Sequence, residues 1–232
     1  MSDWVRFYDF KHSVIYVNLR HRDVHYRTIA EDIRAYVPSP VAHVLDYGCG
    51  EATSADLVAG ACAQLVLVEA APNVRASLAM RYAGNAKIRV IAADETAALP
   101  GASFDLVVMH SVAQYLTGAE LDRLLGIFRS LLRPGALFIL GDIVKPNLAA
   151  PAAALSLLRF AAANGFFWAA AFGLVRIFAS DYLRLKKTAG LSHYSEAQML
   201  ERLKQAGFSA ERAARNIGHN QQRMTFLCRV GG

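Results

Sequence analysis

The segment Val44-Leu45-Asp46-Tyr47-Gly48-Cys49-Gly50-Glu51-Ala52-Thr53 decides the fold. Its apolar start leads into two glycines one residue apart, which is typical of a buried strand that ends in a tight turn. A helix of small residues is expected directly after the turn, over residues 54–61. Ligands of open α/β sheets bind beyond the carboxyl ends of the strands, so these glycines would let a ligand approach bare backbone.

Strands and helices alternate on the carboxyl side of this segment. Pro72 is typical of the first turn of a helix, and Thr117 with Glu120 forms a capping box for another. A third helix begins at the capping box of Ser195 and Gln198. The pattern predicts seven strands, over residues 41–47, 64–69, 87–92, 104–109, 136–141, 209–215 and 223–230. It therefore predicts an α/β fold, with a doubly wound, seven-stranded and mostly parallel sheet that carries helices on both faces.

The composition of the chain changes three times, and each change predicts a boundary. Residues 1–40 are polar and aromatic and form an N-terminal helical cap. Residues 41–145 form the cofactor-binding core. Residues 146–192 are rich in Ala, Phe and Leu and form an apolar helical insertion after the fifth strand, while residues 193–232 add the last helix and two strands of the core.

Two acidic residues follow successive strands. Glu69 ends the second strand, 21 residues after Gly48, where a carboxylate can accept hydrogen bonds from both hydroxyls of a ribose. Asp94 follows the third strand, where a carboxylate could accept from the exocyclic amine of a base. Together with the glycine turn, these residues predict a nucleoside site. Thr53 stands where the usual fingerprint for NAD has a third glycine, so the pattern disfavours that nucleotide.

The chain resembles the class I S-adenosylmethionine-dependent methyltransferases. Asp46-Tyr-Gly-Cys-Gly50 is similar to the first motif of that family, with Ala52 in place of the third glycine, and Glu69 stands at the acidic ribose position of the second motif. Ala93-Asp94-Glu95 and Ser103–Val108 are similar to the third and fourth motifs, and Leu132-Arg-Pro-Gly135 matches the turn before strand five. The resemblance implies S-adenosyl-L-methionine as cofactor, S-adenosyl-L-homocysteine as product, and no metal.

The same resemblance implies a set of site residues. Asp46, Gly48 and Gly50 would line the methionine part of the cofactor, Glu69 the ribose, and Asp94 the adenine amine. The residues assigned to the cofactor are Asp46, Gly48, Cys49, Gly50, Glu69, Ala70, Asp94, Glu95 and His110. The sulfonium methyl is already electrophilic, so the protein must align a nucleophile and exclude water, and a general base helps an oxygen nucleophile. His110 is the first candidate for that base or for a substrate contact, and Tyr115 the second.

The insertion leaves three interpretations open. Residues 160–175 are 16 residues without a charge, which is short for a membrane span of about 20. A lid over an apolar substrate, a homodimer interface, and a helix lying on a membrane surface would each cover its aromatic side chains. The resemblance favours the lid, because substrate elements of the family often lie after strand five. The sequence therefore predicts methyl transfer to O or N of a small apolar or lipid-like acceptor.

Composition excludes several other classes. Hydrophobic residues make up 54% of the 232 residues, which excludes a disordered chain. The three cysteines form no C-x-x-C pair, so neither a disulfide scaffold nor a zinc site is expected, and His21 with His25 lacks a third metal ligand. The formal net charge is +6 with scattered basic residues, so no nucleic acid is expected as partner.

An RNA methyltransferase and a non-catalytic nucleoside-binding or membrane-docking protein remain alternatives. No secretory signal is recognised, so the expected location is the cytoplasm, with peripheral membrane contact as a further alternative.

Overall fold

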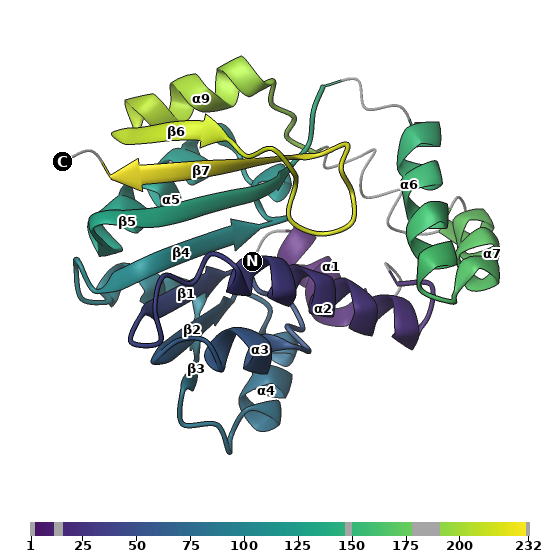
Figure 1. The fold of residues 1–232 in the computed structure, drawn as a ribbon, viewed down its shortest axis with the longest axis horizontal. Helices are drawn as coiled ribbons and strands as arrows, with labels where there is room; N and C mark the ends of the chain where they lie inside the picture. The colour runs from purple at the N-terminus through teal and green to yellow at the C-terminus, as the bar shows by residue number, and fades with distance from the viewer. Residues whose placement is uncertain (1–2, 12–15, 147–149, 178–190, 231–232) are drawn as a thin grey trace.

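A computed structural model describes residues 3–11, 16–146, 150–177 and 191–230. A seven-stranded sheet runs through these residues with its strands in the order β3-β2-β1-β4-β5-β7-β6 (Figure 1). The strands are β1 (His43–Tyr47), β2 (Gln64–Glu69), β3 (Ile88–Ala92), β4 (Phe104–His110), β5 (Leu132–Ile143), β6 (Phe208–Arg212) and β7 (Met224–Val230). β7 pairs antiparallel with both β5 and β6, and the other pairs are parallel. The predicted fold class is confirmed.

The order of the strands places a topological switch point at β1. β1 pairs with β2 on one side and with β4 on the other, so the chain leaves β1 in one direction and returns in the other. In register, Tyr47 lies beside Val68 and Met109, and His110 lies beside Gly141. The carboxyl ends of β1, β2, β4 and β5 therefore meet at one edge, which is where ligands bind in such sheets.

Helices cover both faces of the sheet. On one face, Ile33, Val58 and Leu78 are buried together with the inward residues of β1 and β2. On the other face, Phe128 and Leu203 are buried with residues of β4, β5 and β7. The helices are α1 (Asp3–Lys11), α2 (Leu19–Arg34), α3 (Ala55–Ala59), α4 (Pro72–Arg81), α5 (Gly118–Leu131), α6 (Ala150–Ala163), α7 (Phe167–Ile177) and α9 (Glu196–Gln205). Each fully buried Leu or Phe side chain contributes about 1.5–3 kcal/mol to folding.

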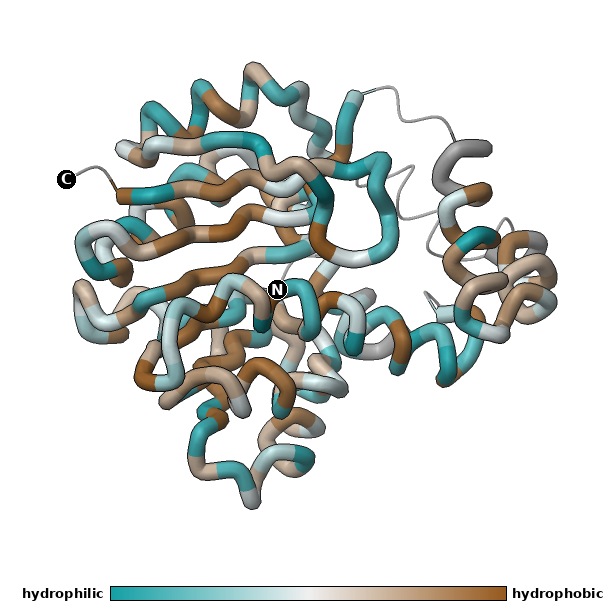
Figure 2. The backbone as a smooth tube through the Cα atoms, in the orientation of Figure 1, coloured by the Kyte–Doolittle hydropathy of each residue, from teal (hydrophilic) through white to brown (hydrophobic). Residues whose placement is uncertain are grey.

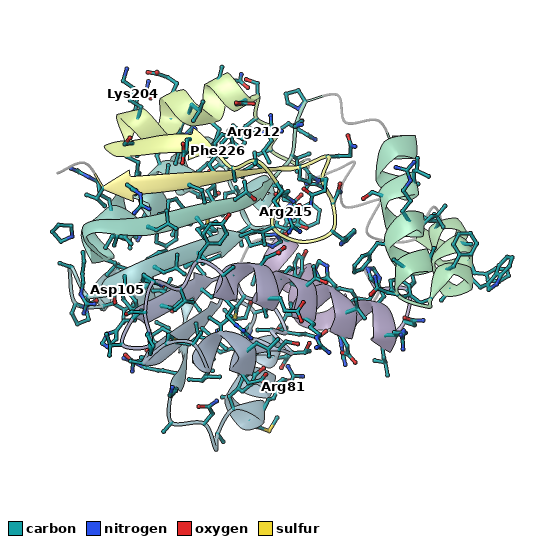
Figure 3. All side chains as sticks on the ribbon, in the orientation of Figure 1. Arg81, Asp105, Lys204, Arg212, Arg215 and Phe226 are labelled. Carbon is teal, nitrogen blue, oxygen red and sulfur yellow. The ribbon has the colours of Figure 1, made fainter. Side chains whose placement is uncertain are left out.

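The middle of the sheet holds buried apolar side chains, whereas an ion pair lies at the amino ends of its strands. Phe226 of β7 is fully buried, and Figure 3 shows it close to Arg212, its register partner on β6, with Lys204 farther out on α9. Asp105, at the amino end of β4, accepts a hydrogen bond from the backbone of His43 at 2.8 Å and pairs with Arg133. This ion pair ties the amino ends of β1, β4 and β5 together, on the edge opposite the switch point.

Local signals in the sequence set the helix ends. The hydroxyl of Thr117 accepts from the backbone of Glu120, whose carboxylate accepts from the backbone of Thr117 at 2.7 Å. The predicted box of Ser195 and Gln198 has the same reciprocal geometry. α2 begins at Leu19, because the Asn18 side chain accepts from the backbone of His21 at 2.8 Å and caps the helix there.

Two strands differ from the sequence prediction. β5 runs from Leu132 to Ile143 instead of 136–141, since it continues past Gly141 to pair Ile143 with Met224. β6 ends at Arg212 instead of residue 215, and the chain then forms a loop before β7. That loop, residues 213–223, returns to the carboxyl edge of the sheet.

The pair of helices α6 and α7 stands at the edge of the molecule, beside the amino end of α2 (Figure 1). Its own small core holds Ala161, Phe166 and Ala170, with Val17 from the segment before α2 packed against them. Figure 2 shows hydrophobic residues along the central strands and again in this helix pair. Among the described residues, no helix has both the length and the apolar character that a membrane span requires. Residues 147–149 and 178–190 of the predicted insertion lie outside the described residues.

Candidate functional site

The turn after β1 needs glycine at two positions. Gly48 has φ of 71° and Gly50 has φ of 60°, in the left-handed region that side chains disfavour. A Cβ atom on Gly48 would overlap Cγ2 of Val112, and one on Gly50 would lie 2.5 Å from the Tyr26 hydroxyl oxygen. The turn is therefore packed against α2 on one side and the segment after β4 on the other. Its backbone faces the space beyond the carboxyl ends of the strands.

Glu69, the last residue of β2, lies beside the glycine turn. Its Oε2 accepts from the backbone of Gly50 at 2.9 Å and its Oε1 from the backbone of Ala71 at 2.8 Å, while the residue is only 8% exposed. Burial raises the pKa of this carboxyl, and the backbone hydrogen bonds oppose that rise. A carboxylate has about four acceptor positions, so two stay available for a ligand.

Asp46 is a partly buried acid without a compensating donor. Burial, and to a smaller extent repulsion by Glu69, raises the pKa of Asp46 to about 7. Among the described residues, no donor lies within hydrogen-bond distance of this carboxyl, although it lines the cavity described next. An acid in this state would be stabilised as a carboxylate by a cationic ligand group.

One cavity of about 640 Å³ joins these features. Its volume lies within the range of about 300–1,000 Å³ that is usual for small-molecule sites. The ends of β1, β2, β4 and β5 form its floor. The helices α1 and α2 and the loop 213–223 supply aromatic and polar walls, with side chains from Trp4, Tyr8, Tyr16, His21, His25, Tyr26, His219, Asn220 and Arg223.

Comparison with known proteins agrees with this geometry. Residues 45–140, which span β1 to β5, match the family described as "Methyltransferase domain". Curated relatives include uncharacterized methyltransferases of Mycobacterium tuberculosis and Mycobacterium bovis, which are 33% identical over 129 residues. Over residues 45–140 the chain is therefore similar to the methyltransferase domain of these proteins. The match to these relatives covers 54% of this chain and 61% of theirs.

Solved methyltransferase structures share the fold at low sequence identity. A putative methyltransferase in complex with the Haloferax volcanii Trm112 activator has a TM-score of 0.63 at 11% identity, covering 100% of this chain and 99% of that one. DhpI in complex with S-adenosylhomocysteine has a TM-score of 0.61 at 14% identity, covering 98% and 94%. Phosphoethanolamine N-methyltransferase 1 of Haemonchus contortus has a TM-score of 0.63 at 13% identity, covering 99% and 48%.

The carboxyl edge of the sheet fits S-adenosylmethionine, the cofactor that the sequence resemblance implies. The unpaired acid of Asp46 suits the cofactor's ammonium, and the turn at Gly48 and Gly50 offers close approach to backbone. Cys49 and Ala70 also line the cavity, as does His110. Seven of the nine residues assigned to the cofactor therefore lie around this one cavity.

Asp94 and Glu95 do not join them. The chain turns into the 3₁₀ helix η2 (Ala93–Ala98) directly after β3, and only Ala93 of the predicted motif lines the cavity. Asp94 is exposed on that helix. Glu95 accepts from the backbone of Ala92 at 2.7 Å, so it caps the helix. An acidic residue after a strand does not reveal which way a short helical turn will direct its side chain.

His110 lines the cavity, but both of its ring nitrogens have protein neighbours. Nε2 lies 3.2 Å from the carbonyl oxygen of Ile217, and because a carbonyl only accepts, Nε2 carries the hydrogen. Nδ1 lies 3.1 Å from Oγ of Ser111, which donates to Asp142 at 2.8 Å. Ser111 and Asp142 have φ of 60° and 62°, a strained backbone of the kind that is concentrated at functional sites.

Tyr115 belongs to an aromatic cluster with α1. Its hydroxyl lies 2.8 Å from that of Tyr8, and its ring centroid lies 4.6 Å from that of Trp4. Asp9 anchors the same helix, accepting from the backbone of Asn73 at 2.6 Å at the start of α4. All three aromatic residues line the cavity, so α1 forms one of its walls.

The sequence analysis missed the histidines as part of this site. His21, His25 and His219 all line the cavity. Burial lowers the pKa of each, that of His21 to about 4, so all three are neutral at pH 7. The i, i+4 spacing of His21 and His25 was a usable signal, although the sequence analysis considered it only for a metal, which the lack of a third ligand disfavoured. No group of metal-ligating residues occurs in the described part of the chain.

The insertion contributes little to the cavity itself. Leu157 of α6 lines it, while Phe160 and Phe166 stack on His219 and His21 from behind. Trp168 is 72% exposed and does not line it. α6 thus supports one wall, whereas α7 presents exposed aromatic surface, so the choice between lid, interface and membrane contact stays a prediction.

Proposed function

We propose that this protein is a methyltransferase that moves a methyl group from S-adenosylmethionine to an oxygen or nitrogen atom of a small acceptor of low polarity. The observation that supports this most is that two chemically different sets of residues line one cavity. One set is Asp46, the glycine turn and Glu69, and the other is a group of neutral histidine and tyrosine rings. The first set suits a charged nucleoside cofactor, and the second suits an uncharged acceptor.

The acids and the glycine turn would hold the cofactor through three contacts. The carboxylate of Asp46 would pair with the ammonium group, which removes the cost of leaving that charge buried and unpaired. The free acceptor positions of Glu69 would take the ribose hydroxyls. The backbone of Gly48 and Gly50 would lie close to the ligand, since any side chain there would meet Val112 or Tyr26. Asp94 is exposed and is not part of this proposal.

The bound cofactor would supply an electrophilic methyl group on a sulfonium sulfur. The protein residues would then do three things: hold the acceptor atom in line with that methyl group, exclude water from the cavity, and remove a proton where the acceptor is a hydroxyl. Trp4, Tyr8 and Tyr115 would close the cavity from the α1 side. Because the pKa values of His21 and His25 are lowered, both rings are neutral at pH 7, and no cationic imidazole would repel the sulfonium.

The test is transfer of a radiolabelled methyl group from S-adenosylmethionine. The purified protein is incubated with separate pools of phenols, carboxylic acids, amines, fatty acyl compounds and RNA, and extracted products are counted. We expect label in a small-molecule pool and none in RNA. Label in RNA alone would contradict the proposed acceptor, and a protein that binds the cofactor but labels no pool would favour a non-catalytic nucleoside-binding role.

A further inference from the structure

His219 is one of the polar side chains of the cavity that make no hydrogen bond within the described residues, as are His25 and Asp46. It lies in the loop 213–223 between β6 and β7 and lines the cavity. Its ring stacks on Phe160 with centroids 4.3 Å apart and planes 16° apart. The described residues make no hydrogen bond to either of its nitrogens. The ring is therefore fixed by stacking, while its polar edge stays available to a ligand.

The surroundings of His219 also suit a reversible charge. The centroids of His25 and His21 lie 5.8 and 6.4 Å from its own. Burial lowers the pKa of His219, the carboxylate of Asp142 opposes that change, and His110 and Arg223 reinforce it. The ring is thus neutral at pH 7, with one lone pair free, and an acid lies near enough to stabilise the imidazolium once it forms.

His110 has a less suitable arrangement for the same task. Its Nε2 already donates to Ile217, and its Nδ1 faces the hydroxyl of Ser111. Nδ1 keeps its lone pair, but the Ser111 hydroxyl oxygen lies 3.1 Å from it, so a substrate hydroxyl could reach Nδ1 only by displacing that contact. The two histidines are nevertheless adjacent, since the ring of His110 lies beside Gly218, the residue before His219. His110 thus orders the floor under the loop that carries His219.

We propose that His219 is the general base for a phenolic acceptor. This rests on the proposed methyl transfer. The neutral imidazole takes the hydroxyl proton, the oxygen lone pair forms the new O–C bond to the methyl group, and the C–S electron pair stays on sulfur. The products are an aryl methyl ether, the neutral thioether and an imidazolium, which loses its proton to solvent.

The acceptor is assigned to the phenols on two grounds. A phenol has a pKa near 10, so a neutral imidazole can remove its proton during the reaction, whereas an aliphatic hydroxyl is far less acidic. The wall around His219 is also made of rings: Tyr16 and Tyr26 are joined by a 3.0 Å hydrogen bond, and both line the cavity with His25. Ring faces and edges of this kind pack well against an aromatic acceptor.

The experiment compares His219→Gln with the wild-type protein, using phenol and 2-naphthol as acceptors. The variant keeps a polar side chain of similar length but cannot act as a base. We expect kcat to fall about 10²–10⁴-fold. The KM for the cofactor should stay unchanged. The rate of the wild type should rise with pH through the pKa of His219 and then level off, and this rise should be absent in the variant. His193→Gln is the matched control, because His193 is exposed and does not line the cavity.

A second readout does not depend on turnover. In ¹⁵N-histidine spectra of the complex with S-adenosylhomocysteine, phenol should shift the His219 ring signals and leave those of His193 in place. If phenol is methylated equally by wild type and His219→Gln, or if only amines are methylated, the base assignment is wrong. If the wild type binds no S-adenosylhomocysteine at all, the proposed function itself fails. If the product complex forms but phenol moves no His219 signal, the acceptor assignment is wrong.

Discussion

Oε2 of Glu69 accepts a hydrogen bond from the backbone of Gly50 at 2.9 Å. The acid at the end of β2 and the glycine turn after β1 therefore form one unit, although 19 residues separate them. The second oxygen holds the backbone of Ala71, at the start of α4. This arrangement fixes the carboxylate in place before any ligand binds, and it leaves acceptor positions directed away from the protein's own donors.

Replacing Glu69 by Gln should weaken cofactor binding. The variant loses a charged acceptor for the ribose hydroxyls, and a hydrogen bond to a charged group contributes about 1.5–3 kcal/mol. Calorimetric titration with S-adenosylhomocysteine measures the change. Glu196→Gln, which breaks a surface ion pair with Arg212, is the control and should bind normally. Equal affinity of Glu69→Gln and wild type would show that Glu69 serves only the turn.

Replacing Gly48 by Ala should destabilise the fold as well as the site. The new Cβ would overlap Val112 and would require a left-handed backbone of a residue with a side chain. We expect a loss of about 1–3 kcal/mol in the free energy of unfolding, measured with urea. Adding Val112→Ala should restore part of the loss by removing the steric overlap but not the backbone strain. Full restoration would mean that strain at Gly48 is negligible.

Replacing Asp46 by Asn should separate stability from binding. The pKa of Asp46 is raised to about 7 in the folded protein, above its ordinary value, so the folded state binds more protons than the unfolded state between those two values. The free energy of unfolding of the wild type should therefore fall as pH rises toward about 7. At pH 8 the variant should be more stable than the wild type by about 1–3 kcal/mol, with little difference at pH 4.

The same variant should bind S-adenosylhomocysteine more weakly at pH 8, because the ammonium loses its carboxylate partner. Urea unfolding and calorimetry at the two pH values measure both effects. A variant that is less stable than the wild type at pH 8 would contradict the assignment of Asp46 as an unpaired, partly buried acid in the ligand-free protein.

Replacing Asp9 by Ala should loosen the α1 wall. Asp9 accepts from both the backbone and the side-chain amide of Asn73, at 2.6 and 3.0 Å, and so acts as a cap for α4 from another helix. The free energy of unfolding should fall by about 1–2 kcal/mol. In limited proteolysis, α1 of the variant should be cleaved after a shorter digestion time than α1 of the wild type. Asp56→Ala, an exposed acid on α3, is the comparison and should leave the cleavage of α1 unchanged.

The sheet could be predicted because its signals are local. Apolar runs, a glycine turn and capping pairs act over a few residues, and the strands from β1 to β4 lie within two residues of their predicted bounds. Glu69 could be predicted because the length of a βαβ unit is nearly fixed. Asp94 was misplaced for a local reason as well, since a 3₁₀ turn of small residues gives almost no periodic signal.

The walls that α1 and the loop 213–223 add to the cavity could not be predicted from the sequence. Tyr8 and Tyr115 are 107 residues apart, as are His110 and Ile217, and neither pair belongs to a repeating unit. Their contact depends on how α1 and the loop 213–223 fold back over the sheet edge. The aromatic residues of the insertion divide in the same way, because Phe166 packs inward while Trp168 is exposed, and only tertiary contacts distinguish them.

The most direct test of the cofactor site is calorimetric titration of the wild-type protein with S-adenosylhomocysteine and, separately, with NAD. The account predicts one binding site for S-adenosylhomocysteine per chain, with affinity reduced by Glu69→Gln, and no heat of binding for NAD. Binding of NAD with equal affinity, or failure to bind S-adenosylhomocysteine in a protein shown to be folded, would contradict it.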